Sequence, residues 1–450
     1  METVTSGLST IDYVIFGIYA IVVLVIALSA SRKNHKSAEG YFLAGKSIPW
    51  WAVGASLIAA NISAEQFIGM SGSGYAIGMG IAAYEIMAAV TLILVGKYFI
   101  PIFIEKGIYT IPEFVEKRFN KTLKTILAIF WISLYILVNL TSVLYLGGLA
   151  LETILGIPLM YSILGLAAFA LLYSVYGGLS AVVWTDVIQV AVLVIGGFAT
   201  SYVALKWIGQ GEGFMAGWST LVQDIPEHFE MILDRSNPNF SQLPGISVLI
   251  GGLWVTNLYY WGFNQYIIQR TFAAKSIHEA QTGLVFAGFL KLIIPLICVI
   301  PGIAAYYITV HNPALLDSLK EQYGNIVANN IPTADHPDKS YPWVAQLLPT
   351  GLKGVVFAAL AAAIVSSLAS MLNSTATIFT MDIYKEYINK SASDVSLVRV
   401  GRLTAIVALA IAIFIAPLLS SLGQAFQFIQ EYTGVVSPGI LSVFLCGLFY

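Results

Sequence analysis

The sequence is divided into apolar runs that are each about as long as a helix needs to cross a lipid bilayer. A bilayer core needs about 20 apolar residues of helix. Hydrophobic residues make up 58% of the chain and charged residues only 10%, whereas a soluble domain carries about 25% charged residues. We therefore predict an integral membrane protein with spans at about residues 11–31, 48–72, 76–104, 122–150, 157–177, 180–208, 244–269, 277–309, 351–383, 397–419 and 421–449.

The basic residues predict the orientation of these spans. Lys and Arg are enriched in cytoplasmic loops, and an N-terminus outside the cell places most of the 22 Lys and Arg residues on the inner side. Two longer polar segments, 209–243 and 310–350, then lie outside. The first span has its basic residues behind it, at Arg32, Lys33 and Lys36, which is typical of a retained anchor rather than a cleaved signal peptide.

Two of the spans carry polar interruptions. "SLIAANISAEQFIGMSGSGY", residues 56–75, places Asn61, Glu65 and Gln66 inside the second span, and "NLYYWGFNQY", residues 257–266, interrupts the seventh. Irregular backbone survives at membrane depth only where protein or a water-filled cavity surrounds it, and transporters use such broken helices at their binding sites. Close helix packing is an alternative reading for the Gly and Ser residues at 71–74, but it does not account for the amides and the carboxylate.

The two interruptions are five spans apart, which predicts an internal repeat. Because five is an odd number, the second copy would enter the membrane from the opposite side, as in inverted-repeat transporters. We expect an all-α fold with repeats at 47–208 and 244–450 and an extra N-terminal helix and cytoplasmic loop at 1–46. The outer loop at 209–243 separates the repeats, and a second outer loop, 310–350, lies within the later one. The last span has no basic flank, so we also expect the natural chain to continue past residue 450.

Four long motifs carry a resemblance to a known family. "YFLAGKSIPWW", "SLIAANISAEQFIGMSGSGY", "YGGLSAVVWTDVIQ" and "AAAIVSSLASMLNSTATIFTMDIY" resemble the sodium:solute symporter family, and the likeness is close to its bacterial sodium/galactose branch from Asp12 onward. The resemblance implies an inverted-repeat fold of the leucine-transporter type, a place in the bacterial inner membrane, and sodium-driven sugar uptake by alternating access.

A candidate cation site combines the second and ninth spans. Sodium is bound by about five hard oxygen ligands, neutral ones included. Ala363, Ser366 and Ser367 lie one helical turn apart in "AAAIVSSLAS", so a carbonyl and the hydroxyls can point to one place. The resemblance implies that these residues bind sodium together with Ala59 and Ile62. The alternative is that the serines only bond to the backbone of their own helix.

Two further charges lie close to predicted span ends. Asp186, in "VVWTDVIQ", is either an acid that attracts the ion on its way to the cytoplasm or a helix N-cap. Arg270, in "YIIQRTFAAKS", is expected to anchor the headgroup region or an inner loop, without a role in transport.

A candidate solute site is suggested by two isolated charges in apolar spans, Glu85 and Lys291. If both face one cavity, their charges offset each other and a neutral polyhydroxyl solute fits; a purely structural ion pair is the alternative. Amides can read hydroxyl groups, and an aromatic face can lie against a sugar ring. The resemblance implies that the solute is held by Gln66, Glu85, Asn257, Tyr260, Lys291 and Gln430, with Tyr260 as inner gate and Met70, Tyr84 and Phe426 as outer gate.

The sequence therefore predicts a sodium symporter for a neutral monosaccharide. Ala88 stands where the resembled branch has a serine, which leaves the preferred sugar open. Other small neutral or zwitterionic solutes, such as proline or a sialic acid, are the alternative within the same class. A channel and a membrane sensor are the alternatives outside it. No metal cluster or hydrolase triad is visible in the sequence, so we expect no enzyme.

Overall fold

The structure, a computed structural model, describes residues 8–31, 37–63, 65–243, 245–421 and 425–449. A few side chains within these ranges, notably those of Glu65 and of residues 420, 421 and 425–431, lie outside the described part. The described residues form helices and two isolated β-bridges, as expected where lipid leaves every backbone group to be satisfied within the protein. The all-α prediction is confirmed.

The helices of the first half are α1 (Thr10–Ser31), α2 (Ala38–Leu43), η1 (Ala44–Lys46), α3 (Trp50–Asn61), η2 (Glu65–Met70), α4 (Ser71–Ala76), η3 (Met79–Ala82), α5 (Ala83–Leu94), η4 (Val95–Phe99), α6 (Ile100–Glu105), α7 (Ile111–Arg118), α8 (Lys121–Leu134), η5 (Tyr135–Leu140), α9 (Thr141–Leu155), α10 (Leu159–Ile208), α11 (Phe214–Asp224), η6 (Pro226–Phe229) and η7 (Pro238–Ser241). Those of the second half are α12 (Gly245–Ser247), η8 (Val248–Gly252), α13 (Leu253–Phe263), α14 (Gln265–Phe272), α15 (Ile277–Lys291), α16 (Ile294–Tyr306), η9 (Tyr307–His311), α17 (Pro313–Tyr323), α18 (Asn325–Ala328), η10 (Pro337–Lys339), α19 (Ser340–Ala345), α20 (Leu352–Ile378), η11 (Phe379–Ile388), α21 (Asp394–Ile415), η12 (Ala416–Ser421) and α22 (Ala425–Phe449).

The predicted spans correspond to these helices. Among the described residues, 8 helices are long and apolar enough to cross a membrane. The remaining predicted spans are the two interrupted ones and 157–177, whose apolar part is the shorter stretch Leu159–Leu172. The fifth and sixth spans join directly in α10, where Gly178 has φ 54° and lies against the Tyr41 carbonyl. Only glycine adopts this backbone without a Cβ clash, so the expected division near residue 178 is observed.

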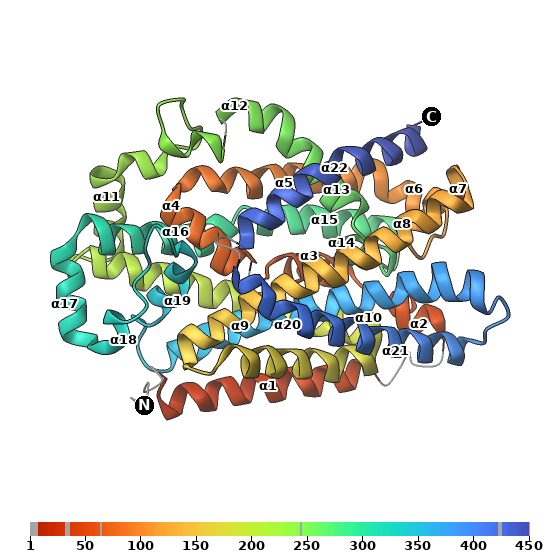
Figure 1. Ribbon diagram of the computed structural model, residues 1–450, viewed down its shortest axis with the longest axis horizontal. Coiled ribbons are helices and arrows are strands. Elements are labelled where there is room, and N and C mark those ends of the chain that lie inside the picture. The colour runs from red at the N-terminus through yellow and green to blue at the C-terminus, as the bar shows by residue number, and fades with distance from the viewer. Residues whose placement is uncertain (1–7, 32–36, 64, 244, 422–424, 450) are drawn as a thin grey trace.

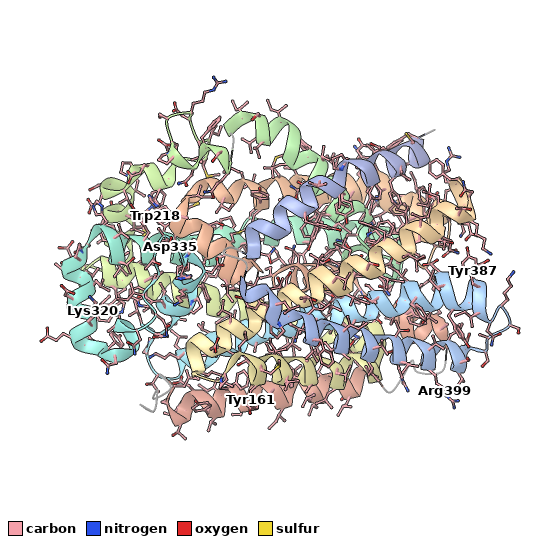
Figure 2. The ribbon with its side chains drawn as sticks, viewed as in Figure 1. Tyr161, Trp218, Lys320, Asp335, Tyr387 and Arg399 are labelled. Atoms are coloured by element: carbon pink, nitrogen blue, oxygen red, sulfur yellow. The ribbon has the colours of Figure 1, made fainter. Side chains whose placement is uncertain are left out.

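The two ends of the molecule carry different sets of loops. In Figure 1 the long helices run roughly along the horizontal axis, with α11, α17 and α18 at one end and α2 and α7 at the other. Figure 2 places Lys320 and Asp335, both predicted to lie outside, at the opposite end from Arg399, which is predicted to lie inside. The start of α1 lies at the same end as Lys320. Its Asp12 carboxylate accepts a hydrogen bond at 2.7 Å from the amide of Gly351, which directly follows the predicted outer loop 310–350.

Both predicted interruptions are present in the structure. In the second span, α3 ends at Asn61 and Ile62 is extended, with ψ 93°. In the seventh span the break is a single residue, Asn264, with φ −89° and ψ 115° between α13 and α14. The Tyr135 hydroxyl donates to the Asn264 side chain at 2.5 Å and holds the break. Asn257 lies on continuous helix, so the interruption is narrower than the polar stretch suggested.

Close helix crossing joins the outer half of the second span to the eighth span. A Cβ placed at Gly302 of α16 would lie 1.9 Å from the Ser71 carbonyl oxygen of α4. Any larger side chain at position 302 would therefore overfill this contact, and overfilling a packed interior costs about 1–3 kcal/mol.

We expect Gly302→Val to lower the Tm of the detergent-solubilised protein by about 3 °C or more, since each kcal/mol is equivalent to about 2–4 °C in a protein of more than 150 residues. Gly165→Ala is the control, because nothing lies within 4 Å of a Cβ at that position. Equal Tm values for Gly302→Val and native protein would contradict the close crossing.

Candidate functional site

The break after α3 leaves backbone carbonyl groups without their helical donors. The last regular bond of the helix joins the Ile62 amide to the Ile58 carbonyl at 2.8 Å. In a continued helix the Ser63 amide would donate to the Ala59 carbonyl, but here it donates to Gln66 Oε1 at 3.0 Å. The Gln66 side chain therefore stabilises the break, and the Ala59 carbonyl loses its helical partner, the Ser63 amide.

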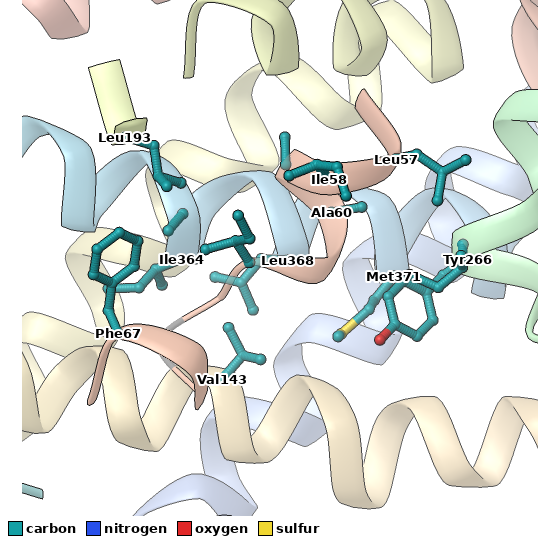
Figure 3. Close-up of a cluster of buried hydrophobic side chains, with 14 of the residues drawn as sticks. Leu57, Ile58, Ala60, Phe67, Val143, Leu193, Tyr266, Ile364, Leu368 and Met371 are labelled. Carbon is teal, nitrogen blue, oxygen red and sulfur yellow. The ribbon is translucent and has the colours of Figure 1, made fainter. Parts of the chain in front are cut away.

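The ninth span supplies hydroxyl groups beside this break. Ala363, Ser366 and Ser367 on α20 are fully buried, and the Ser367 hydroxyl donates to the Ala60 carbonyl at 2.9 Å. This contact brings α20 against the end of α3, so the reading in which the serines bond only within their own helix is wrong for Ser367. Figure 3 shows Ala60, Ile364 and Leu368 packed in the surrounding apolar cluster.

The donor set at this place fits a sodium ion. The predicted ligands are carbonyl and hydroxyl oxygens on two neighbouring elements, which is the chemistry of a hard cation. The apolar surroundings limit competition from water. The role of Ala59, Ile62, Ala363, Ser366 and Ser367 as sodium ligands stays a prediction.

Asp186 lies next to the same serines. It is fully buried on α10, and its carboxylate accepts the hydroxyls of Ser56 and Ser366 at 2.5 Å each. The carboxylate therefore contacts other spans rather than the start of its own helix, and the N-cap reading is wrong. Its assignment as an ion-exit residue stays a prediction.

Arg270 does not lie where the sequence suggested. Only 1% of its surface is exposed, and one of its terminal nitrogens is 3.7 Å from the Asp186 carboxylate. The expectation of a headgroup anchor or a contact with an inner loop was wrong, because a basic residue near the end of an apolar run can also turn inward when a buried acid faces it.

A polar cavity of about 90 Å³ lies beside the two breaks. Most of the residues predicted to bind or gate the solute line it: Gln66, Met70, Tyr84, Glu85, Asn257, Tyr260 and Lys291, together with Ala88. Phe426 and Gln430 belong to α22, and their side chains lie outside the described residues. The structure thus brings together the described members of the predicted solute site.

The two isolated charges form an ion pair in this cavity. The Lys291 ammonium donates both to Glu85 Oε2 and to Asn61 Oδ1, and it lies 5.0 Å from the centre of the Trp261 ring, a cation–π contact. Both side chains are almost fully buried. The pair is neutral overall and lines the cavity, so it presents hydrogen-bonding groups without a net charge.

Asn61 links this pair to the break in the second span. Its side-chain amide donates to the Tyr260 hydroxyl at 2.9 Å, and Tyr260 is hydrogen-bonded to the Tyr266 hydroxyl. Tyr260 lies on α13 and Tyr266 on α14, so the network crosses both interruptions. The predicted gating role of Tyr260 stays a prediction.

The side-chain amide of Asn257 makes hydrogen bonds along its own helix. It donates to the Leu253 carbonyl at 2.9 Å and accepts from the Trp261 indole at 3.2 Å. One lone pair of Asn257 Oδ1 and one N–H of its amide remain after these two bonds, so contact with a solute is compatible with them.

The sequence reasoning missed Asn139 as a cavity residue. Asn139 lies on the π-helix η5 and lines the cavity, and its buried Oδ1 has no hydrogen-bond partner within the described part of the chain. A buried polar atom normally has a partner, so this oxygen is a candidate acceptor for a solute hydroxyl. The signal was present in "YILVNLTS", a lone amide in an apolar run.

Comparisons with known proteins agree on one family. The sequence profile of the sodium:solute symporter family matches residues 41–450. A sodium/glucose cotransporter of Vibrio parahaemolyticus is 71% identical over 100% of this chain and 82% of its own length. Sodium/myo-inositol cotransporter 2 of Homo sapiens is 34% identical over 99% of this chain and 67% of its own length.

A solved structure has the same fold. A Na⁺-coupled sialic acid symporter in a substrate-bound outward-open state superposes with a TM-score of 0.82 over 98% of this chain and 87% of that one. The two sequences are 24% identical, so this likeness bears on the fold alone. It confirms the predicted leucine-transporter-type architecture.

The buried ion pair generates a stability prediction. Removing one partner of such a pair costs about 3–5 kcal/mol, whereas removing both charges is often nearly neutral. We expect Lys291→Met to lower the Tm in detergent clearly, because Glu85 is left uncompensated, and Glu85→Gln combined with Lys291→Met to recover most of the loss. A double variant as unstable as Lys291→Met would show that the two charges do not offset each other.

Proposed function

The chain belongs to the sodium:solute symporter family, and we propose that it imports a neutral monosaccharide of the galactose or glucose type together with sodium. The observation that carries this proposal is the network from Glu85 through Lys291 to Asn61. At one end this network lines the solute cavity, and at the other it reaches Asn61, the last residue of α3 before the break.

The cavity supports a neutral polyhydroxyl solute. Its charges are paired, and the residues around them are amides, hydroxyls and aromatic rings. A site built to hydrogen-bond hydroxyl groups rejects analogues that lack them, because its buried polar groups are then left unpaired. Aromatic faces such as that of Tyr260 can lie against the apolar face of a sugar ring. The named substrates of the similar proteins, glucose and myo-inositol, belong to this class.

The geometry supports coupling between ion and solute. Sodium bound by Ala59 and Ile62 would order the backbone on either side of Asn61, and Asn61 in turn positions Lys291 and Tyr260. A solute held by this cavity orders the same network from the other side. Each ligand then favours the state that binds the other, which is reciprocal coupling. Both are released on the inner side when the repeats, proposed at 47–208 and 244–450, rock past each other.

We infer a transporter rather than an enzyme, located in a bacterial inner membrane with the N-terminus outside. The similar proteins named above are cotransporters, and the end of the molecule that holds Lys320 and the start of α1 is opposite to the end that holds Arg399.

Uptake of labelled galactose into liposomes containing the purified protein tests the proposal. We expect accumulation with an inward sodium gradient and none with potassium in its place. Labelled glucose, proline and a sialic acid serve as competitors. Competition by glucose and not by proline or sialic acid supports the sugar assignment, whereas accumulation without a sodium gradient would contradict the proposed mechanism.

The sodium site generates a second prediction. Ser367→Ala removes a predicted ligand and the bond to Ala60, so we expect the sodium concentration for half-maximal uptake to rise about tenfold or more. Thr375→Val is the matched control, because Thr375 lies on the same helix and its hydroxyl donates to the Met371 carbonyl of that helix. Unchanged sodium dependence in Ser367→Ala would remove Ser367 from the site.

A further inference from the structure

Another cavity lies at the end of the molecule that is predicted to face the cytoplasm. Its volume is about 650 Å³, and side chains of α2, α7, α8, η11 and the start of α21 line it. Figure 2 shows Tyr387 of η11 and Arg399 of α21 at this end, opposite to Lys320. None of the described residues that line the solute cavity lines this one, so the two cavities are separate.

Acidic side chains dominate the lining of this inner cavity. Six carboxylates and two ammonium groups line it, those of Glu39, Glu113, Glu116, Asp382, Glu386 and Asp394 and those of Lys124 and Lys385. Lys117 and Lys121, which are not lining residues, form ion pairs with Glu113 and Glu386. Even with these two lysines counted, the ionised cavity has more negative than positive charges.

One of the carboxylates is buried with an oxygen atom left unpaired. Asp382 is 1% exposed. Its carboxylate interacts with Thr110, and its Oδ1 lies 3.5 Å from the Lys124 ammonium, which also donates to Glu116 at 2.5 Å. Its Oδ2 has no hydrogen-bond partner within the described part of the chain. Since a buried polar atom normally has a partner, Oδ2 is a candidate acceptor for a ligand in the cavity.

Two further carboxylates of the lining have no basic partner. Glu39 of α2 and Asp394 in the first turn of α21 form no ion pair with any described residue, and neither does Lys385. The Tyr109 hydroxyl donates to Glu39 at 3.5 Å, and the charge of Asp394 also acts on this hydroxyl. The two carboxylates therefore lie near one group and form a second acceptor position.

The spacing of these acids does not suit a metal ion. A hard divalent cation needs several oxygen ligands within about 2.6 Å, and the described residues contain no group of three or more His, Cys, Asp or Glu side chains that could hold one. An organic cation can carry its charges on separate ammonium groups. Each ammonium donates several hydrogen bonds, so one molecule can meet carboxylates on different elements.

We propose that the inner cavity binds a linear alkyl diammonium ion from the cytoplasm. One ammonium group donates to Asp382 Oδ2, and the other donates to Glu39 and Asp394. The methylene chain between them lies along Met381 and the Tyr109 ring, which also line the cavity. Charge-assisted hydrogen bonds of this kind are about twice as strong as neutral ones. The inference does not depend on which solute the protein transports.

Calorimetric titration of the purified full chain with 1,4-diaminobutane tests the site. Low ionic strength limits screening, and a buffer slightly above neutral pH keeps the carboxyl groups ionised. We expect saturable binding of one molecule per chain. Butylamine has a single charge and loses one set of hydrogen bonds, so we expect its dissociation constant to be about tenfold higher or more.

Two results of this titration would overturn the proposal. The first is binding that does not saturate, or an equal affinity for butylamine, because the site would then not recognise a second ammonium group. The second is displacement of 1,4-diaminobutane by Mg²⁺ at equal or lower concentration, because the cavity would then respond to charge alone or hold a metal ion.

Variants of the lining place the ligand in the cavity. We expect Asp382→Asn to raise the dissociation constant for 1,4-diaminobutane about tenfold or more, because a charged acceptor is lost. Glu105→Gln is the matched control, since it removes the same charge on the same predicted side and Glu105 is not a lining residue. Native affinity in a folded Asp382→Asn variant would contradict the site.

A second variant applies if Asp382→Asn fails to fold. Glu39→Gln combined with Asp394→Asn removes the other acceptor position, and neither side chain is fully buried. We expect the same loss of affinity for 1,4-diaminobutane and an unchanged affinity for butylamine. A folded double variant that binds 1,4-diaminobutane as tightly as the native chain would overturn the proposal.

Discussion

The structure depends on one constraint, which is that every backbone polar group inside the bilayer must find a partner. Continuous helices satisfy it in most spans. The helix ends after Asn61, and side chains replace some of the missing helical hydrogen bonds. The Gln66 side chain accepts from the Ser63 amide, and the Ser367 hydroxyl donates to the Ala60 carbonyl. A break that is stabilised by side chains from its own segment and from α20 can exchange one of these partners for an ion. The same stretch of chain is therefore both an interruption of the helix and the place where we propose that sodium binds.

Two of the buried ion pairs lie near the candidate sites. Glu85 and Lys291 face the cavity, where their charges cancel and leave hydrogen-bonding groups for an uncharged solute. Asp186 and Arg270 are not among the residues that line the cavity, and they contact α20 through Ser366 and Ser370. Buried pairs contribute little to stability and are strongly destabilising when broken. The folding free energy alone therefore gives no reason for burying these charges, which is consistent with the proposed roles in ligand binding.

The spans and the fold class could be predicted from the sequence because both follow from local properties. Apolar length fixes a span, and glycine at position 178 marks the boundary within α10. The interruption of the seventh span was predicted within 257–266, but its position at Asn264 depends on Tyr135, which is 129 residues away in the chain. A local pattern contains no information about such a partner.

The candidate site shows the same limit. Glu85 and Lys291 could be paired from the sequence because isolated charges in lipid need a counter-charge. The sequence predicts that Arg270 anchors the headgroup region or an inner loop, because its distant partners, Asp186 and Ser56, cannot be read from the sequence around it. The second half of the sodium site, from Ala363 to Ser367, rested on the family resemblance as well as on helical spacing.

The central claim is that one network joins the ion site to the solute site through Asn61. Titration of the native protein with ²²Na⁺ at several fixed galactose concentrations tests it most directly, because coupling between two binding sites is reciprocal. The account predicts that galactose lowers the dissociation constant for sodium, and that sodium lowers the dissociation constant for galactose by the same factor. Sodium affinity that is independent of galactose, at concentrations where galactose binding is saturated, would contradict it.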